Sequence, residues 1–360
     1  MTKPLLLKNL RLMGADAADV LIEGGRIAQI APKIKPTAEV TVEDCGSALA
    51  LPGLVDAHAH LDKTLWGMPW HPHQQGKSLQ QMIDTERALR HELDMDAERQ
   101  SARQVALSLS KGTTAIRTHV DIDTEHGLSL HRGVAATRAR YADVMQIEIV
   151  AFPQSGLMIR PGTLELMDQA LREGADIVGG LDPCGIDRDP KGQLDAVFGL
   201  AEKHGKPIDI HLHEPGEMGA FSLEMILDRT EALTMQGRVT VSHAFCLGMG
   251  DQARVAGLLD RIAMLDVSLA TTAPAARPVP SVAACRDRGI AICAGNDGIR
   301  DTWTTYGNAC MLERAMLLAW RSGYRTDDDL AIAFDCASAA GAAMLGLRGH
   351  GLAVGDCADL

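Results

Sequence analysis

A chain of 360 residues, 46% of them hydrophobic, is long enough to form one large α/β barrel with a small appended unit. A formal net charge of −12 without a cluster of basic residues argues against nucleic acid or an anionic membrane surface as a partner. No apolar run approaches the roughly 18 residues of a membrane span, and the eight cysteines include no C-x-x-C pair. We therefore expect a cytoplasmic protein with reduced cysteines.

The first 52 residues predict a strand-rich unit. Residues 5–12, 19–30 and 40–51 contain β-prone stretches, and Glu23-Gly24-Gly25 predicts a hairpin turn inside the second of them. Three or four strands alone would expose an apolar face. A strand-like pattern in residues 347–360 is expected to join them in a small β-sandwich-like domain built from both chain termini. This pattern stops abruptly, which suggests that the natural chain is longer or that the small sheet is incomplete.

Residues 53–346 predict a barrel. Short apolar strands alternate there with amphipathic helical segments, which is typical of βα units with parallel strands. The candidate strands are residues 54–58, 114–120, 147–152, 176–181, 207–212, 238–242, 265–270 and 290–294. Eight such units predict a (β/α)8 TIM-type barrel. An open doubly wound sheet is the alternative, but it would usually carry a glycine-rich phosphate loop, and the sequence contains none.

Histidine and acidic residues stand at the carboxyl ends of several predicted strands, where barrel enzymes place their active sites. His58 and His60 end the first strand, and residues i and i+2 of a strand project to the same face. An isolated pair of this kind is more often two hydrogen-bonded core histidines than a metal site. Strands two, five, six and eight, however, end in His119 and Asp121, in His211, His213 and Glu214, in His243, and in Asp297. Together they can supply three imidazoles and a carboxylate to a divalent transition metal.

In these motifs the chain resembles the amidohydrolase superfamily, and among its branches it is most similar to bacterial cytosine deaminase. The resemblance covers about residues 51–346. It rests on an ordered set of motifs, namely Pro52–Asp62, Arg117–Asp121, Ile149–Gln154, Ile208–Glu214, Ser242–His243 and Gly295–Trp303.

The resemblance implies one divalent metal ion, with zinc or iron(II) expected and manganese also compatible. The implied metal ligands are His58, His60, His211 and Asp297. His213 lies on the same strand face as His211, so alternation alone leaves open which of the two binds the metal, and family position favours His211. Strand four ends in residues 180–182 without a lysine that could bridge two metals, so a mononuclear site is expected.

The resemblance also implies the catalytic roles. A metal-bound hydroxide would attack the amino-bearing carbon, His243 and Asp297 would accept its proton and aim it, and Glu214 would be the proton shuttle. Glu217 is a rival acid, although the intervening Pro-Gly pair is expected to turn it away. Two interpretations of His119 are open, a buried strand histidine or a residue that contacts the metal ligands from outside, and the first is slightly favoured.

Candidate substrate-binding residues follow from the resemblance and from departures from it. Gln154 is implied to bind the amide edge of a substrate ring, and His213 and Trp303 are further pocket candidates. In the divergent loop after strand one, residues 63–77, Lys63 and Trp66 are new candidates. Gly298 replaces a second aspartate of the family, which is expected to leave space for a larger ring.

These residues predict a metal-dependent hydrolytic deaminase that releases ammonia from an amino-substituted nitrogen heterocycle, such as a cytosine-like pyrimidine. The alternative within enzymes is hydrolysis of another C–N bond, in a cyclic amide or an N-alkylamino triazine-type substrate. A catalytically inactive barrel used as a binding scaffold would lack ligands or the acid, which this chain retains. The expected partner is a small heterocycle, and a barrel of this size is compatible with a homo-oligomer.

Overall fold

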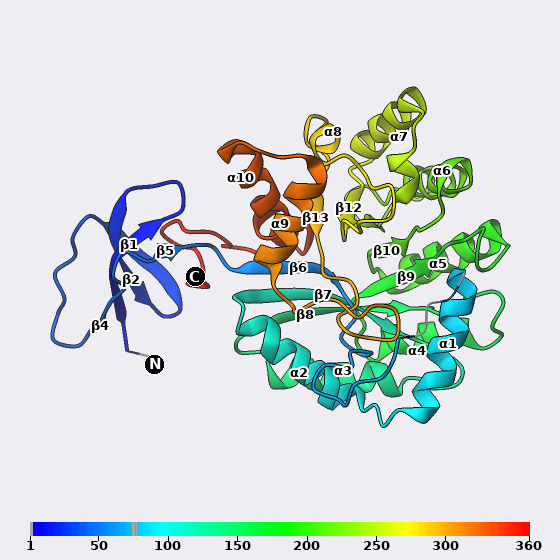
Figure 1. Cartoon of the computed structure of the whole chain (residues 1–360), viewed down its shortest axis with the longest axis horizontal. Helices are drawn as coiled ribbons and strands as arrows, with labels where there is room; N and C mark the ends of the chain where they lie inside the picture. Colours follow the sequence, from blue (N-terminus) through cyan, green and yellow to red (C-terminus); the bar gives the residue numbers. More distant parts are fainter. Residues whose placement is uncertain (1–2, 74–75, 77) are drawn as a thin grey trace. The chain divides into compact units, whose positions relative to one another are not determined.

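The structure is a computed structural model that describes residues 3–73, 76 and 78–360, so part of the divergent loop after the first barrel strand lies outside the described residues. The chain divides into two compact units, which are described separately below (Figure 1). Residues 1–54 and 346–360 form the small unit, and residues 55–345 form the large one.

The small unit contains one five-stranded sheet. Its strands are β1 (Leu5–Leu12), β2 (Ala17–Glu23), β3 (Arg26–Ala31), β4 (Thr41–Asp44) and β5 (Leu49–Ala50). β1 pairs antiparallel with β2 and parallel with both β4 and β5. The predicted hairpin joins β2 to β3 through Gly24 and Gly25, whose φ angles of 58° and 77° lie in the left-handed region that glycine tolerates.

The C-terminal segment belongs to this small unit, as expected, but it forms no regular strand among its described residues. It runs beside β3, where the backbone of Ile27 donates to Asp356 and accepts from Gly355. A single β-bridge joins Arg26 to Cys357. Leu352 and Ala358 pack against the apolar side chains of β1 and β2, so the return of the chain contributes side chains to this core.

The large unit is the predicted barrel, and its eight-stranded parallel sheet follows chain order throughout. The strands are β6 (Leu54–Ala59), β7 (Thr113–Asp121), β8 (Gln146–Phe152), β9 (Ile177–Leu181), β10 (Ile208–His211), β11 (Val239–Ser242), β12 (Ser268–Thr271) and β13 (Ile292–Ala294). A bridge between Ala59 and Asp297 brings the last strand end back to the first. The fold class expected from the sequence is confirmed.

Helices alternate with these strands. They are α1 (Leu79–Glu92), α2 (Ala97–Leu109), α3 (Ser129–Arg140), α4 (Thr163–Arg172), α5 (Pro190–His204), α6 (Gly216–Ala232), the 3-10 helix η1 (Phe245–Gly248), α7 (Gln252–Met264), α8 (Val282–Arg286), α9 (Met311–Ser322), α10 (Asp327–Cys336) and α11 (Ala339–Met344). α5 shows how the sequence sets such limits. Asp189 caps its first turn, Pro190 opens it, and Gly205 ends it with a φ of 64°.

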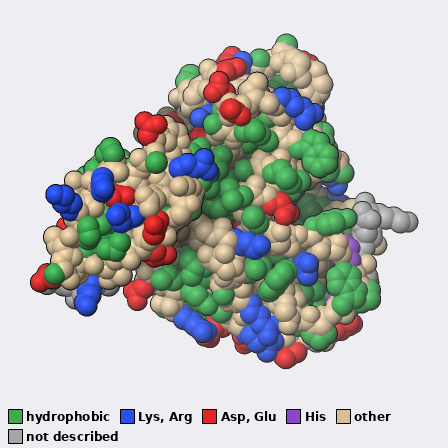
Figure 2. All heavy atoms as spheres, turned by 60° about the vertical axis from the view of Figure 1, so that its left-hand side comes forward, with side chains coloured by type: hydrophobic (Ala, Val, Ile, Leu, Met, Phe, Trp, Pro, Cys, Tyr) green, Lys and Arg blue, Asp and Glu red, His purple; other side chains and the backbone are tan. Residues whose placement is uncertain are grey.

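One close approach fixes how the barrel ends meet. A Cβ atom at Gly295 would lie 2.5 Å from the Cβ atom and the carbonyl oxygen of His58, so only glycine lets the segment after β13 lie against β6. On the face drawn in Figure 2, basic and acidic side chains are interspersed. Among the described residues, no helix is long and apolar enough to cross a membrane.

Candidate metal centre

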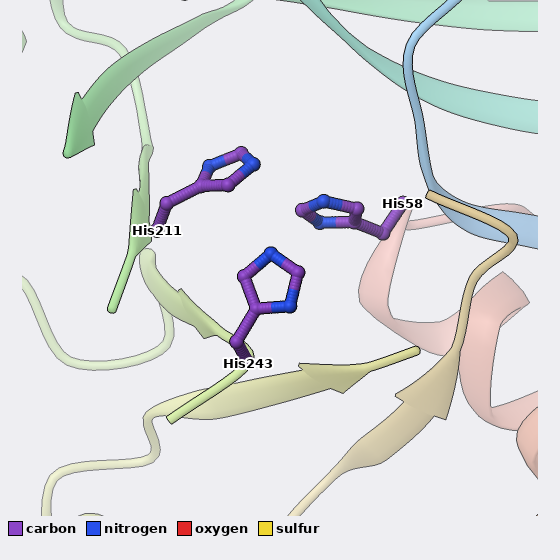
Figure 3. A group of neighbouring side chains, drawn as sticks. All are labelled: His58, His211 and His243. Carbon is purple, nitrogen blue, oxygen red and sulfur yellow. The ribbon is translucent and has the colours of Figure 1, made fainter. Parts of the chain in front are cut away.

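The carboxyl ends of the strands bring the predicted ligands together. His58 lies within β6 and His60 directly follows it, while His211 ends β10 and His243 follows β11. Figure 3 shows the rings of His58, His211 and His243 pointing toward one another from three strands. Asp297 enters from the loop after β13, where its backbone N–H donates to the carbonyl of His58.

Three separations among the four proposed donor atoms fit a shared metal ion, and His58, His60 and Asp297 form one possible ligand group. Nε2 of His60 lies 3.4 Å from Nε2 of His211 and 3.4 Å from Oδ1 of Asp297. Nε2 of His58 lies 3.7 Å from the same carboxylate oxygen. Ligands at about 2.0–2.1 Å from a tetrahedral metal are about 3.3–3.4 Å apart. The three measured separations are close to this spacing.

The protonation of these groups suits a cation. Burial lowers the pKa of His60 and of His211, which favours the neutral imidazole that a metal requires. Burial alone would raise the pKa of Asp297, but the neighbouring imidazoles of His58 and His60 hold it well below its usual range. Nε2 of His58 is buried without a hydrogen-bond partner among the described residues. A divalent cation would satisfy this nitrogen and the carboxylate together.

His243 and His119 complete a cluster of imidazoles. His243 lies near enough to His58 and His211 to form a second possible ligand group. Both of its ring nitrogens are buried without a partner among the described residues, and burial lowers its pKa well below the usual value. The ring of His119 lies 4.3 Å from that of His58 and 4.4 Å from that of His211. It therefore packs directly against two of the proposed ligands.

A chain of hydrogen bonds behind His58 selects its tautomer. The Ser242 hydroxyl lies 2.9 Å from Nδ1 of His58 and donates to the Asp209 carboxylate at 2.7 Å. Since its single proton faces Asp209, the hydroxyl accepts from Nδ1–H of His58, and Nε2 keeps its lone pair for a metal. Arg117 donates to Asp209 at 3.2 Å and neutralises it inside the barrel. None of the residues in this series of hydrogen bonds except His58 was predicted from the sequence to have a role.

The carboxylate of Glu214, the predicted proton shuttle, is bound on the side of the β9–α5 loop. It accepts hydrogen bonds from the backbone N–H groups of Cys184 and Gly185, at 2.8 and 2.7 Å, and from the Ser222 hydroxyl of α6. Burial raises its pKa, and these hydrogen bonds oppose the rise. No hydrogen bond of the described residues joins this carboxylate to the imidazole cluster. Its role as a shuttle stays a prediction.

His213, by contrast, lies beside the cluster. Its ring stacks on that of His243 with centroids 4.3 Å apart, and its side chain is 26% exposed. Nδ1 lies 2.8 Å from Asp182, and although burial opposes the charged form, this carboxylate raises the pKa of His213. The Asp182 carboxylate thus engages a ring nitrogen of His213, whereas Nε2 of His211 lies beside Nε2 of His60. This geometry favours His211 as the metal ligand.

The predicted substrate residues near β6 form a buried charged network. The Lys63 ammonium donates to Asp121 at 2.9 Å and to Oε1 of Gln154 at 3.0 Å, and it lies 3.3 Å from Glu86. Because Lys63 can only donate, it fixes the Gln154 amide with its oxygen inward, so the NH2 group is the end left for a substrate. Nε1 of Trp303 donates to Glu86 at 2.7 Å.

Trp66 and Gly298 lie differently from expectation. The ring of Trp66 lies under the Arg300 guanidinium at 4.6 Å, and among the described residues no hydrogen bond or ring contact joins it to Lys63 or the imidazoles. At Gly298 a Cβ atom would lie 1.9 Å from Oδ2 of Asp301, so that carboxyl occupies the volume directly beside the glycine. The expectation that the glycine leaves room for a larger ring stays a prediction.

Comparison with known proteins agrees with this geometry. The model of the amidohydrolase family matches residues 75–360. The uncharacterized protein YahJ of Escherichia coli K12 is 34% identical over 304 residues, which cover 83% of this chain and 66% of that protein.

Two solved structures are similar over almost the whole chain. N-isopropylammelide isopropylaminohydrolase from Burkholderia multivorans is 49% identical with a TM-score of 0.96, and the match covers 99% of this chain and 90% of that one. The 5-methylcytosine deaminase from Klebsiella pneumoniae, liganded with 5-fluorocytosine, is 25% identical with a TM-score of 0.85, covering 98% and 89% of the two chains.

Proposed function

The chain belongs to the amidohydrolase family, and from this premise we propose that it removes an alkylamino group hydrolytically from an oxo-substituted 1,3,5-triazine. As an amidohydrolase it is a hydrolase of carbon–nitrogen bonds. The observation that carries the finer proposal is the 49% identity to the Burkholderia isopropylaminohydrolase over 99% of the chain. The alternative from the sequence, an N-alkylamino triazine-type substrate, thereby takes precedence over cytosine-like deamination.

The donor set proposed for the metal is His58, His60, His211 and Asp297, and zinc or iron(II) is the proposed ion. When bound, a divalent cation supplies Lewis-acid activation of water at neutral pH. The neutral His243, with both ring nitrogens unpaired among the described residues, is placed to take a proton from the attacking water. The carbon–oxygen bond forms as the carbon–nitrogen bond breaks, so the departing amine needs a proton.

Two groups compete for the delivery of this proton. Glu214 is the group implied by the resemblance, but its carboxylate is held by Cys184, Gly185 and Ser222. His213 stacks on His243, and although burial opposes the charged form, the Asp182 carboxylate raises the pKa of His213. We favour His213, which as an imidazolium would give its own proton to the departing amine, while His243 holds the proton taken from water until the site is reset.

Substrate binding is proposed for the edge of the network around Lys63. With its oxygen held by Lys63, the Gln154 amide presents its NH2 group as a donor to a ring carbonyl. An oxo-substituted ring offers such carbonyl groups, which supports a dioxo-triazine as substrate.

The test is amine release by the zinc- or iron-loaded protein. We expect isopropylamine and the trioxo-triazine from 2-isopropylamino-4,6-dioxo-1,3,5-triazine, measured by chromatography, and little ammonia from cytosine. Asp297→Asn is the matched control, since it should release neither product. Turnover of cytosine or of cyclic amides with no amine from any alkylamino-triazine would contradict the proposal.

A second candidate is deamination of a cytosine-like ring. The similarity to the Klebsiella 5-methylcytosine deaminase over 98% of the chain supports it. Ammonia release measured on the same panel of rings separates the two candidates, because only the leaving group differs.

A further inference from the structure

In the loop after β13, a side chain at position 298 would overlap the side chain of residue 301. Gly298 follows the proposed ligand Asp297 and has no side chain, while a Cβ atom built on it would lie 1.9 Å from Oδ2 and 2.8 Å from Cγ of Asp301. The φ angle of Gly298 is not in the left-handed region, so space rather than backbone strain requires glycine there. The carboxyl group next to Asp297 therefore comes from residue 301.

We propose that the Asp301 carboxyl binds the substrate ring by accepting a hydrogen bond from a ring N–H, and so selects rings that carry a lactam edge. The inference rests on the proposed function, because it names the part of a dioxo-triazine that this residue would recognise. The ring carbonyl next to that N–H would face the NH2 group of Gln154.

The carboxyl is held rigidly with one oxygen left over. Oδ1 of Asp301 accepts from the backbone N–H groups of Trp303 and Thr304, at 2.8 and 2.9 Å, and its own N–H donates to the Thr304 carbonyl at 3.0 Å. Oδ2 has no hydrogen-bond partner among the described residues, and it is accessible to water rather than fully buried. A residue that is only 5% exposed thus presents a single free acceptor.

The loop that carries Asp301 is fastened to the loop after β6. The Thr64 hydroxyl donates to the carbonyl of Ile299 at 2.7 Å, and the backbone N–H of Leu65 donates to the carbonyl of Arg300 at 2.7 Å. Residue 64 directly follows Lys63, whose ammonium acts electrostatically on the Asp301 carboxyl and also donates to Gln154. The free oxygen of Asp301 and the free amide of Gln154 are therefore set by one connected framework.

The charges around Asp301 agree with this role. Burial raises its pKa to about 7, with the Lys63 ammonium opposing the rise and the Glu86 carboxylate adding to it. A carboxyl with a pKa of about 7 is ionised in an appreciable fraction near neutral pH, and the ionised form is the one that accepts from a ring N–H. If both oxygens accepted hydrogen bonds from the protein, the carboxyl would have only a structural function, but Oδ2 accepts none among the described residues.

The test compares two variants with zinc-loaded wild-type protein. In Asp301→Asn, Oδ1 keeps its two backbone donors, so the amide nitrogen takes the place of Oδ2 and a donor replaces the acceptor. In Gly298→Ala, the new Cβ atom displaces the carboxyl. We expect KM for the alkylamino-dioxo-triazine to rise about 10- to 100-fold in both, with a smaller change in kcat. Gly199→Ala, a helical glycine with open space around it, is the matched control and should behave as wild type.

A binding measurement separates this inference from the proposed function. Calorimetry with 1,3,5-triazine-2,4,6-trione should show the same loss of affinity in both variants while zinc content and melting temperature stay those of wild type. Wild-type protein that turns over no triazine but binds the trione through Asp301 would overturn the proposed function alone. Unchanged KM and unchanged trione affinity in both variants would overturn the role of Asp301.

Discussion

At the scale of single residues, His213 and Glu214 are neighbours in sequence with opposite surroundings. Backbone N–H groups hold the Glu214 carboxylate in the β9–α5 loop, whereas His213 stacks on His243. Alternation along the strand could not reveal this, because the chain turns into a loop directly after His211. The sequence pattern therefore cannot distinguish His213 from Glu214 as the proton donor, whereas the positions of their side chains can.

Substitution of each residue separates the two roles. While Glu214 stays bound to Cys184 and Gly185, we expect His213→Gln to lower kcat about 10²-fold and Glu214→Gln to lower it less. Steady-state rates with metal analysis check this, because both variants should retain metal. A loss of about 10²-fold in Glu214→Gln with His213→Gln near wild type would instead restore Glu214 as the shuttle.

At the scale of the elements, three strands share a buried chain of polar groups behind the metal centre. Arg117 of β7 neutralises Asp209 of β10, and Asp209 accepts from Ser242 of β11, which holds His58. The side chains of Arg117 and Asp209 are only 5% and 0% exposed. Removal of one charge of such a pair leaves the other buried without compensation.

Arg117→Met is thus expected to lower the free energy of unfolding by about 3–5 kcal/mol, as measured by denaturant titration. The double variant with Asp209→Asn should recover part of this loss, since the carboxylate that then lacks its partner is that of Glu148, whose side chain is 20% exposed. A single variant as stable as wild type would show that water or another group already compensates Asp209.

The strands themselves were predictable because each is a short apolar run followed by a polar residue, as at His58 and His211. The four proposed ligands were implied by the resemblance to the amidohydrolase superfamily, and strand ends that meet at one edge of a barrel bring these residues near one another. Contacts made across strands carried no local pattern, so the link from Ser242 to Asp209 was missed. Asp301 was quoted only as part of a motif, because its place beside residue 298 depends on the backbone of a loop.

At the scale of the whole molecule, all four proposed ligands lie in residues 55–345, the large unit. The small unit has its own core around Val20 and Ile27, which are 0% and 1% exposed. Metal binding to the native state alone stabilises it by mass action, about 2.7 kcal/mol when the free metal is 100 times its Kd. That stabilisation should appear in the large unit.

Removal of the metal by a chelator should therefore lower the unfolding temperature of the barrel. Hydrogen exchange should accelerate in β6, β10 and β11, while the amides of β1 and β2 change little. Asp297→Asn should reproduce the effect without a chelator, and Asp260→Asn, at an exposed carboxylate of α7, serves as control. Equal exchange in every strand with and without metal would argue against a metal centre at these residues.

The shared volume of Gly298 and Asp301 also couples the two positions to each other. An aspartate introduced at 298 would collide with the carboxyl of 301, so one of the two side chains would have to move. The effects of substitutions at 298 and 301 are therefore expected to be non-additive, because each side chain determines how much room the other has.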